Sequence, residues 1–130
     1  MKLSTKGKYG LRAIIDLARF SEKEPVSIGC IATRQKLSER YLEQLFALLK
    51  KAGLVKSIRG ASGGYVLARD ASEISVGDVL RALEGNLEPV RCAAFYSEEG
   101  CMASDECVTK YVWQKINDSI NKTVNEIKLD

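Results

Sequence analysis

The strongest constraint on the fold comes from residues 39–69, where a helical pattern changes directly into a strand pattern. The stretch ERYLEQLFALLKKAG carries its apolar residues at helical spacing along one side. LVKSIRG then alternates apolar and polar residues, and YVLAR is a second short strand after the turn ASGG. The helix is therefore expected to end near Gly53 and to pass into a two-stranded hairpin, with Leu54, Val55 and Ile58 available for burial.

Two further helices are expected before this unit. Residues 8–20 have helical spacing, and the sequence EKEP ends that helix. Ser27 is a predicted N-cap for the short helix IGCIATRQ, in which Cys30 is expected to be a small buried side chain. A tight turn near Lys36 leads to Ser38, the N-cap of the third helix. Three helices followed by a hairpin predict a mainly α fold of the winged helix-turn-helix type.

The second half of the chain is expected to add two helices. Ser75 and Asp78 form a predicted capping box for VGDVLRALEG, which ends at Gly85. A long C-terminal helix then carries one narrow apolar stripe, which needs a partner helix to bury it. Pairing with the same helix of a second copy is favoured over packing on its own domain. The stripe consists of Trp113, Ile116, Ile120, Thr123 and Ile127. The predicted units are a DNA-binding domain (1–84), a cysteine-containing loop (85–107) and a dimerisation helix (108–130).

Charge is distributed unevenly along the 130 residues. Residues 1–69 contain 14 Lys/Arg and 5 Asp/Glu, a net +9, and residues 70–130 contain 6 and 12, a net −6. A basic first half favours a polyanionic partner, most simply duplex DNA, although a solvated basic face is the alternative. Because no apolar run reaches membrane-spanning length and the start lacks an apolar leader, a cytoplasmic protein that binds no membrane is expected.

The predicted DNA-reading surface combines the third helix and the hairpin tip. Early residues of that helix should meet base edges in the major groove, and an arginine beside a glycine-rich turn suits a narrow minor groove. The alternative is that these polar residues only keep the helix soluble, and a phosphate-binding nucleotide loop is rejected because the Gly-Lys-Ser/Thr ending is absent. The base-reading candidates are Arg40, Tyr41, Glu43, Gln44 and Arg59, and the backbone-contacting candidates are Lys2, Lys6, Lys8, Ser38 and Lys56.

Three of the four cysteines, Cys92, Cys101 and Cys107, lie close together after the fourth helix. From the residues alone they form a disulfide remnant, a metal site or three separate thiols. A reducing cytosol disfavours a disulfide framework. Thiolates are the ligands that iron–sulfur clusters need, whereas three cysteines without histidine are incomplete for a closed structural zinc site.

The chain resembles the IscR-like branch of the Rrf-type winged-helix regulators. The resemblance is carried by MKLSTKGKYGLRA, YLEQL, GLVKSIRG, GGY and the three late cysteines, and it covers almost the whole chain. It implies a homodimeric bacterial transcription factor, not an enzyme, with crossed C-terminal helices. It also implies major-groove reading by Glu43 and Gln44, with a part for Glu43 in the choice between two operator classes, and minor-groove reading by Arg59. The same resemblance implies an iron–sulfur cluster on Cys92, Cys101 and Cys107, with 2Fe–2S favoured over the 4Fe–4S type of nitric-oxide-sensing relatives.

The sequence departs from this pattern at the fourth ligand. Relatives of this branch use a histidine where this chain has Lys110, others use an acid where it has Lys8, and the chain contains no histidine. The remaining candidates are a small thiol, water, or one of Cys30, Glu98, Glu99, Asp105 and Glu106. The expected signal is cluster supply, oxidant or nitric oxide. The alternatives are a thiol-redox or zinc-dependent regulator of the same fold, and a cluster-carrying protein that does not bind DNA.

Overall fold

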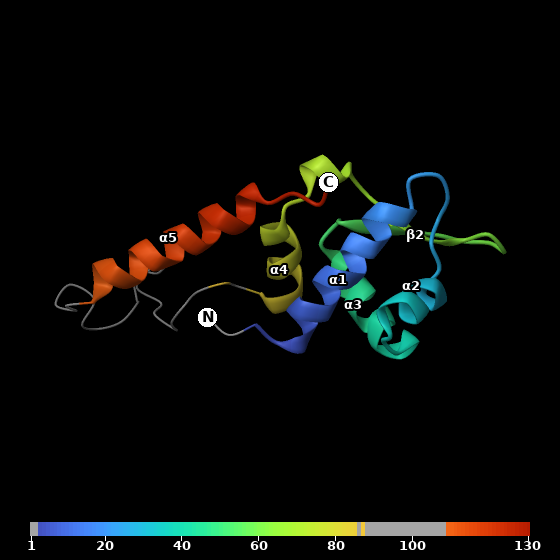
Figure 1. The fold of residues 1–130 in the computed structure, drawn as a ribbon, viewed down its shortest axis with the longest axis horizontal. Coiled ribbons are helices and arrows are strands. Elements are labelled where there is room, and N and C mark those ends of the chain that lie inside the picture. Colours follow the sequence, from blue (N-terminus) through green and yellow to red (C-terminus); the bar gives the residue numbers. More distant parts are fainter. Residues whose placement is uncertain (1–2, 86, 88–108) are drawn as a thin grey trace.

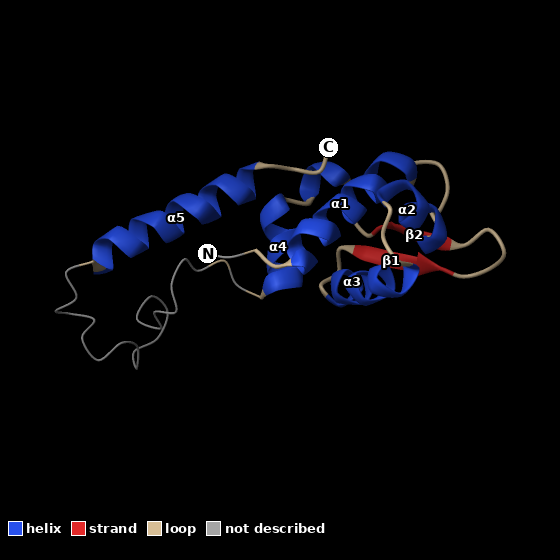
Figure 2. Ribbon diagram, turned by 60° about the horizontal axis from the view of Figure 1, so that its bottom comes forward, coloured by secondary structure: helices blue, strands red, loops and turns tan. Residues whose placement is uncertain are grey.

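The computed structural model describes residues 3–85, 87 and 109–130. The elements follow the expected order of helices around one hairpin (Figures 1 and 2). They are α1 (Thr5–Phe20), α2 (Ile28–Gln35), α3 (Glu39–Lys51), β1 (Val55–Ile58), β2 (Gly64–Leu67), the 3₁₀ turn η1 (Ala71–Glu73), α4 (Val76–Glu84) and α5 (Lys110–Glu126). None of the helices in these ranges combines the length and the apolar character needed to cross a bilayer.

Serine side chains fix where the first four α-helices begin. Ser27, Ser38 and Ser75 each accept a hydrogen bond from a backbone N–H of the following turn, as expected, and Asp78 completes the capping box with Ser75. The start of α1 was predicted three residues too late. Ser4 accepts from the backbone N–H of Lys6, so the helix begins at Thr5 rather than at residue 8.

The core lies where α1, α3 and α4 meet beneath the root of the hairpin. Its fully buried side chains include Ile14, Leu17, Phe46, Leu49 and Val79. The expectation of a buried Ile58 was wrong, because this residue ends β1 at the outer part of the hairpin and is 41% exposed.

The two strands form an antiparallel hairpin, here called the wing (residues 55–67). Val55 pairs with Leu67 and Ile58 pairs with Gly64. The wing root is tied to the α1–α2 connection, since the backbone N–H of Val26 donates to Tyr65 O at 3.0 Å and that of Tyr65 donates to Val26 O at 2.8 Å. A Cβ at Gly64 would collide with the backbone of Val26, so glycine permits this close approach.

Helix α5 packs against α4 on the side away from the wing (Figure 1). Arg81 of α4 donates to the Asn121 side chain at 2.6 Å, and the neighbouring Asn117 is buried. Ile127, predicted to continue the helical stripe, has extended backbone, because its carbonyl accepts from the N–H of Val76 at 2.7 Å. The chain then returns to the core, where Leu129 is buried.

Candidate nucleic-acid interface

The first half of α3 presents one polar, exposed face. Arg40, Glu43 and Gln44 are exposed and stand three and four residues apart, so they share a side of the helix. The opposite side carries Leu42, Leu45, Phe46 and Leu49, which fill the core. Burial of that apolar side fixes the rotation of α3 and leaves the three polar side chains facing outward.

Tyr41 differs from the other base-reading candidates, because it is half-buried rather than exposed as expected. Its hydroxyl donates to Thr5 Oγ1 of α1 at 3.1 Å, and its ring stands edge-on to the ring of Tyr9, with centroids 6.4 Å apart. Tyr41 therefore holds the start of α3 against α1, and only its outer part is available to DNA.

A buried carboxylate holds α2 against α1. Asp16 accepts two hydrogen bonds from the Arg34 guanidinium, at 2.7 and 2.9 Å, and a third from the Gln35 side chain at 2.9 Å. Burial acts to raise the pKa of Asp16, but the hydrogen bonds from Arg34 and Gln35 and the nearby positive charges lower it on balance. Since α2 leads directly into the turn before α3, this clamp sets the angle at which α3 is presented.

The wing carries the other predicted DNA contacts away from the core. Arg59 and Lys56 are exposed, and Figure 2 shows the strands projecting beyond α3 to the turn that follows Arg59. Lys50, near the end of α3, donates to Ser57 Oγ at 3.1 Å and so links the two reading elements. Of the other backbone-contacting candidates, Ser38, Lys6 and Lys8 are exposed, and Lys2 lies outside the described residues.

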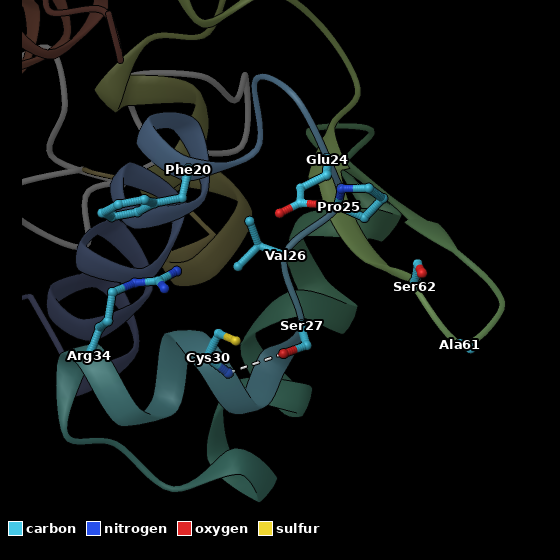
Figure 3. A pocket seen from close by; sticks show the side chains of 10 residues that line it. Phe20, Glu24, Pro25, Val26, Ser27, Cys30, Arg34, Ala61 and Ser62 are labelled. Atoms are coloured by element: carbon cyan, nitrogen blue, oxygen red, sulfur yellow. Dashed lines mark hydrogen bonds between the residues drawn. The ribbon is translucent and has the colours of Figure 1, made fainter.

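Cys30 is exposed, so the prediction of a buried thiol was wrong. Helix α2 has only eight residues, and its buried side passes through Ile31 and Ala32 rather than Cys30. Figure 3 shows the Cys30 side chain in a cavity of about 430 Å³ that also borders Phe20, Arg34 and the wing tip at Ser62. The Arg34 guanidinium lies 4.1 Å from the centre of the Phe20 ring. No pattern in the sequence predicted this cavity.

The cysteine segment itself, with Cys92, Cys101 and Cys107, lies outside the described residues, as do Glu98, Glu99, Asp105 and Glu106. Its flanks are described: α4 ends at Glu84 and α5 begins at Lys110. Cys30 lies on α2, at the end of the molecule opposite to α5, so the fold does not bring this cysteine beside those flanks (Figure 1). Within the described ranges, no three His, Cys, Asp or Glu side chains are grouped closely enough to hold a metal ion.

The helix-turn-helix, the paired wing and the outward polar face of α3 together define a winged-helix DNA-binding regulator. The family described as Rrf2, iron-dependent transcriptional regulator, matches residues 3–130. The chain belongs to the Rrf2 family, and it is a DNA-binding transcriptional regulator of the IscR type.

Named relatives agree with this assignment. The HTH-type transcriptional regulator IscR of Serratia proteamaculans is 43% identical over 99% of this chain and 77% of its own length. The solved structure of T. potens IscR is 49% identical, with a TM-score of 0.77 over 99% of this chain and 83% of that one. CymR (YrzC), the global cysteine regulator of B. subtilis, is 43% identical with a TM-score of 0.79, covering 99% and 93% of the two chains. These relatives are transcriptional regulators, and nothing in the comparison indicates catalysis.

Proposed function

We propose that this chain is a cytoplasmic, homodimeric regulator whose binding to duplex DNA responds to an iron–sulfur cluster held by Cys92, Cys101 and Cys107. The observation that carries the DNA-reading part is the exposed face of Arg40, Glu43 and Gln44 on a helix whose rotation the core fixes. The cluster part is supported by the family and by the chemistry of three neighbouring thiolates.

The reading residues have distinct chemical roles in this proposal. Gln44 pairs with an adenine edge, Glu43 accepts from a cytosine amino group and so bears on operator choice, and Arg40 contacts a guanine or a phosphate. Arg59 enters the minor groove from the wing tip, where the negative potential is strongest in a narrow groove. Lys2, Lys6, Lys8, Ser38 and Lys56 bind the phosphate backbone, which positions these side chains without reading sequence.

A second copy is proposed to cover α5. Along a helix each residue advances by about 100°, so the side bearing Trp113, Ile116, Ile120 and Thr123 adjoins the side packed on α4. Trp113 and Ile120 are half-buried at that border, whereas Ile116 is exposed and so are Tyr111 and Val112. An apolar strip left exposed beside a packed face suits pairing with the same helix of a partner.

The donor set fits an iron–sulfur cluster at three positions and leaves the fourth undefined. Lys110, at the position of the expected histidine, is the first residue of α5, and Lys8 is an exposed cation on α1. When bound, the cluster supplies a ligation and oxidation state that changes with iron supply, oxidant or nitric oxide. The 2Fe–2S form is proposed ahead of 4Fe–4S. The missing histidine is the observation that keeps a thiol-redox or zinc-dependent regulator as the second candidate.

The cysteine ligands are tested by their removal. The chain is purified without oxygen and examined by visible absorption, Mössbauer spectroscopy and metal analysis, beside the triple variant C92A/C101A/C107A and the matched variant Cys30→Ala. We expect iron and sulfide in the wild type and in Cys30→Ala, and neither in the triple variant. Iron retained by the triple variant, or zinc in place of iron, would exclude the proposed cluster.

DNA binding is tested on duplexes selected by the protein from a random-sequence pool. The logarithm of the binding constant should fall linearly with the logarithm of salt concentration, with a slope of about −0.9 for each phosphate contacted. Sequence-specific binding whose strength falls steeply with salt concentration supports a DNA-binding regulator. Absence of any binding at low salt would favour a cluster-carrying protein instead.

A further inference from the structure

The last residue of α4, Glu84, caps the first turn of α1. One carboxylate oxygen, Oε1, accepts from the Ser4 backbone N–H at 3.0 Å, from the Ser4 hydroxyl at 2.6 Å and from the Gly7 backbone N–H at 2.8 Å. Backbone N–H groups in the first turn of a helix have no partner within that helix, and they favour negative charge. No acidic residue of α1 itself lies in its first turn. The carboxylate that satisfies this helix end therefore comes from another element, 77 to 80 residues away in the sequence.

Two glycines let α1 and α4 approach closely at this point. A Cβ at Gly7 would lie 2.6 Å from Glu84 Oε1, and a Cβ at Gly10 would collide with a methyl group of Leu83. Both glycines are buried. The first turns of α1 thus rest on the Leu83 and Glu84 side chains in the last turn of α4, and close packing at this point passes a displacement of that turn on to α1.

The same first turns of α1 contact the reading helix. Thr5 accepts the hydrogen bond from the Tyr41 hydroxyl, and the ring of Tyr9 meets the ring of Tyr41 one turn further on. Tyr41 directly follows Arg40 and precedes Glu43 by two residues. One continuous set of contacts therefore runs from the end of α4, through the start of α1, to the start of α3.

We propose that Glu84 is a positioning residue that transmits the state of the cysteine segment to α3 through the first turn of α1. Glu84 is separated from Cys92 by only seven residues of the chain, so in this proposal a change in the ligation of Cys92 acts on the last turn of α4. The Glu84 carboxylate moves Ser4 and Gly7 with it, and Thr5 then shifts Tyr41 and the direction in which the reading face points. This inference rests on the proposed function and assigns its regulation to named residues.

Hydrogen exchange on the metal-free chain tests these contacts independently of any cluster. In Glu84→Ala the backbone amides of the first turns of both α1 and α3 should lose protection, while α2 keeps its own. Glu84→Gln, which retains an acceptor oxygen at the same place, should lose less. Glu73→Ala removes an exposed acid from η1 as the matched control and should change neither turn. Loss of protection confined to α1 would overturn the inference.

The regulatory readout is the ratio of affinities of the cluster-loaded and metal-free forms for one selected duplex. If the wild-type ratio lies in the range of about 5–150-fold that is typical of coupled sites, Glu84→Ala should bring it close to 1 and Glu73→Ala should leave it unchanged. Thr5→Val, which removes the oxygen that contacts Tyr41, should also bring this affinity ratio close to 1. It replaces Glu84→Ala as the test if Glu84→Ala does not fold. A folded Glu84→Ala or Thr5→Val with the full wild-type ratio overturns this inference alone, whereas a wild-type ratio of 1 overturns the proposed sensing function and the inference with it.

Discussion

The carboxylate clamp between α1 and α2 gives the sharpest stability prediction. The Asp16 side chain is 1% exposed and accepts two hydrogen bonds from Arg34 and one from Gln35. In Asp16→Asn the shape is kept, but the charge is lost and an amide N–H₂ faces donors. Hydrogen bonds to a charged group contribute about 1.5–3 kcal/mol each. The Arg34 side chain, however, is 34% exposed, so water compensates for part of its lost partner.

These opposing effects give an expected loss of about 2–3 kcal/mol in the free energy of unfolding at pH 7, once the exposure of Arg34 is discounted. For a domain of this length, that loss corresponds to a fall in Tm of roughly 6–15 °C. Urea denaturation followed by circular dichroism measures the free energy, and a thermal scan measures Tm. The matched control is Glu22→Gln, an exposed acid in the loop after α1, which should stay within about 0.5 kcal/mol of wild type.

The pH dependence of the stability difference between wild type and Asp16→Asn provides a second test of the clamp. Because the pKa of Asp16 is lowered in the folded state from its ordinary value of 3.8, its contribution to stability is complete above that value. The contribution is lost as the pH falls from 3.8 through the lowered pKa. The gap between wild type and Asp16→Asn should therefore be constant near neutrality and shrink below about pH 4. A gap under about 0.5 kcal/mol at pH 7, or one that widens in acid, would show that the clamp does not work as described.

Three further outcomes are expected. Gly10→Ala should destabilise the fold by about 1–3 kcal/mol in urea denaturation, because the new methyl group collides with Leu83. Replacing a glycine inside a helix by alanine ordinarily stabilises the helix, so a gain of stability here would contradict the close contact. Ser75→Ala should cost about 1 kcal/mol in the same assay by removing the cap of α4, with an unchanged value arguing against the capping box. Arg59→Ala should weaken binding to a selected duplex by about 1–3 kcal/mol, as measured by fluorescence anisotropy titration. Arg69→Ala, which removes an exposed arginine beyond β2, should weaken binding much less. Equal losses of affinity in the two variants would contradict a special role for the wing tip.

Local signals in the sequence were sufficient to predict most of the fold. Serines placed before apolar periodic segments predicted the starts of α2, α3 and α4, since a cap depends on only three or four neighbouring residues. The change from a period of 3.6 to a period of 2 predicted the helix-to-hairpin transition. The winged helix followed from that order alone.

Predictions of burial failed where an element is short or lies at an edge. An eight-residue helix such as α2 makes barely two turns, so its sequence does not fix which side is buried, and Cys30 faces outward. Ile58 satisfies the strand alternation, but the wing extends beyond the core at that point. Ile127 keeps the helical spacing, yet a backbone hydrogen bond to Val76 turns the chain out of the helix. Each error concerns whether the rest of the fold contacts the residue, which no local pattern encodes.

Of the candidate site, exposure of Arg40, Glu43, Gln44 and Arg59 agrees with the sequence-based expectation, and their DNA contacts stay predictions. The bracing role of Tyr41 was missed, because its partners Thr5 and Tyr9 lie 36 and 32 residues earlier in the chain. Glu84 was missed for the same reason: as the last residue of an amphipathic helix it is indistinguishable from an ordinary solvated acid. Pairings at such sequence separations depend on how the helices pack, which a single sequence does not specify.

The close contacts of α4 with its two neighbours lie at different points along this helix. At its end, Leu83 lies against Gly10 of α1, and a close-packed contact of this kind transmits displacement. Toward α5, a Cβ at Gly77 near the start of α4 would collide with the Asn125 side chain. A shift at the end of α4 therefore acts on α1 through Leu83, whereas the close contact with α5 lies about two turns earlier along the helix. In a dimer held together by α5, such a shift would reorient the reading helices while leaving the subunit contact in place.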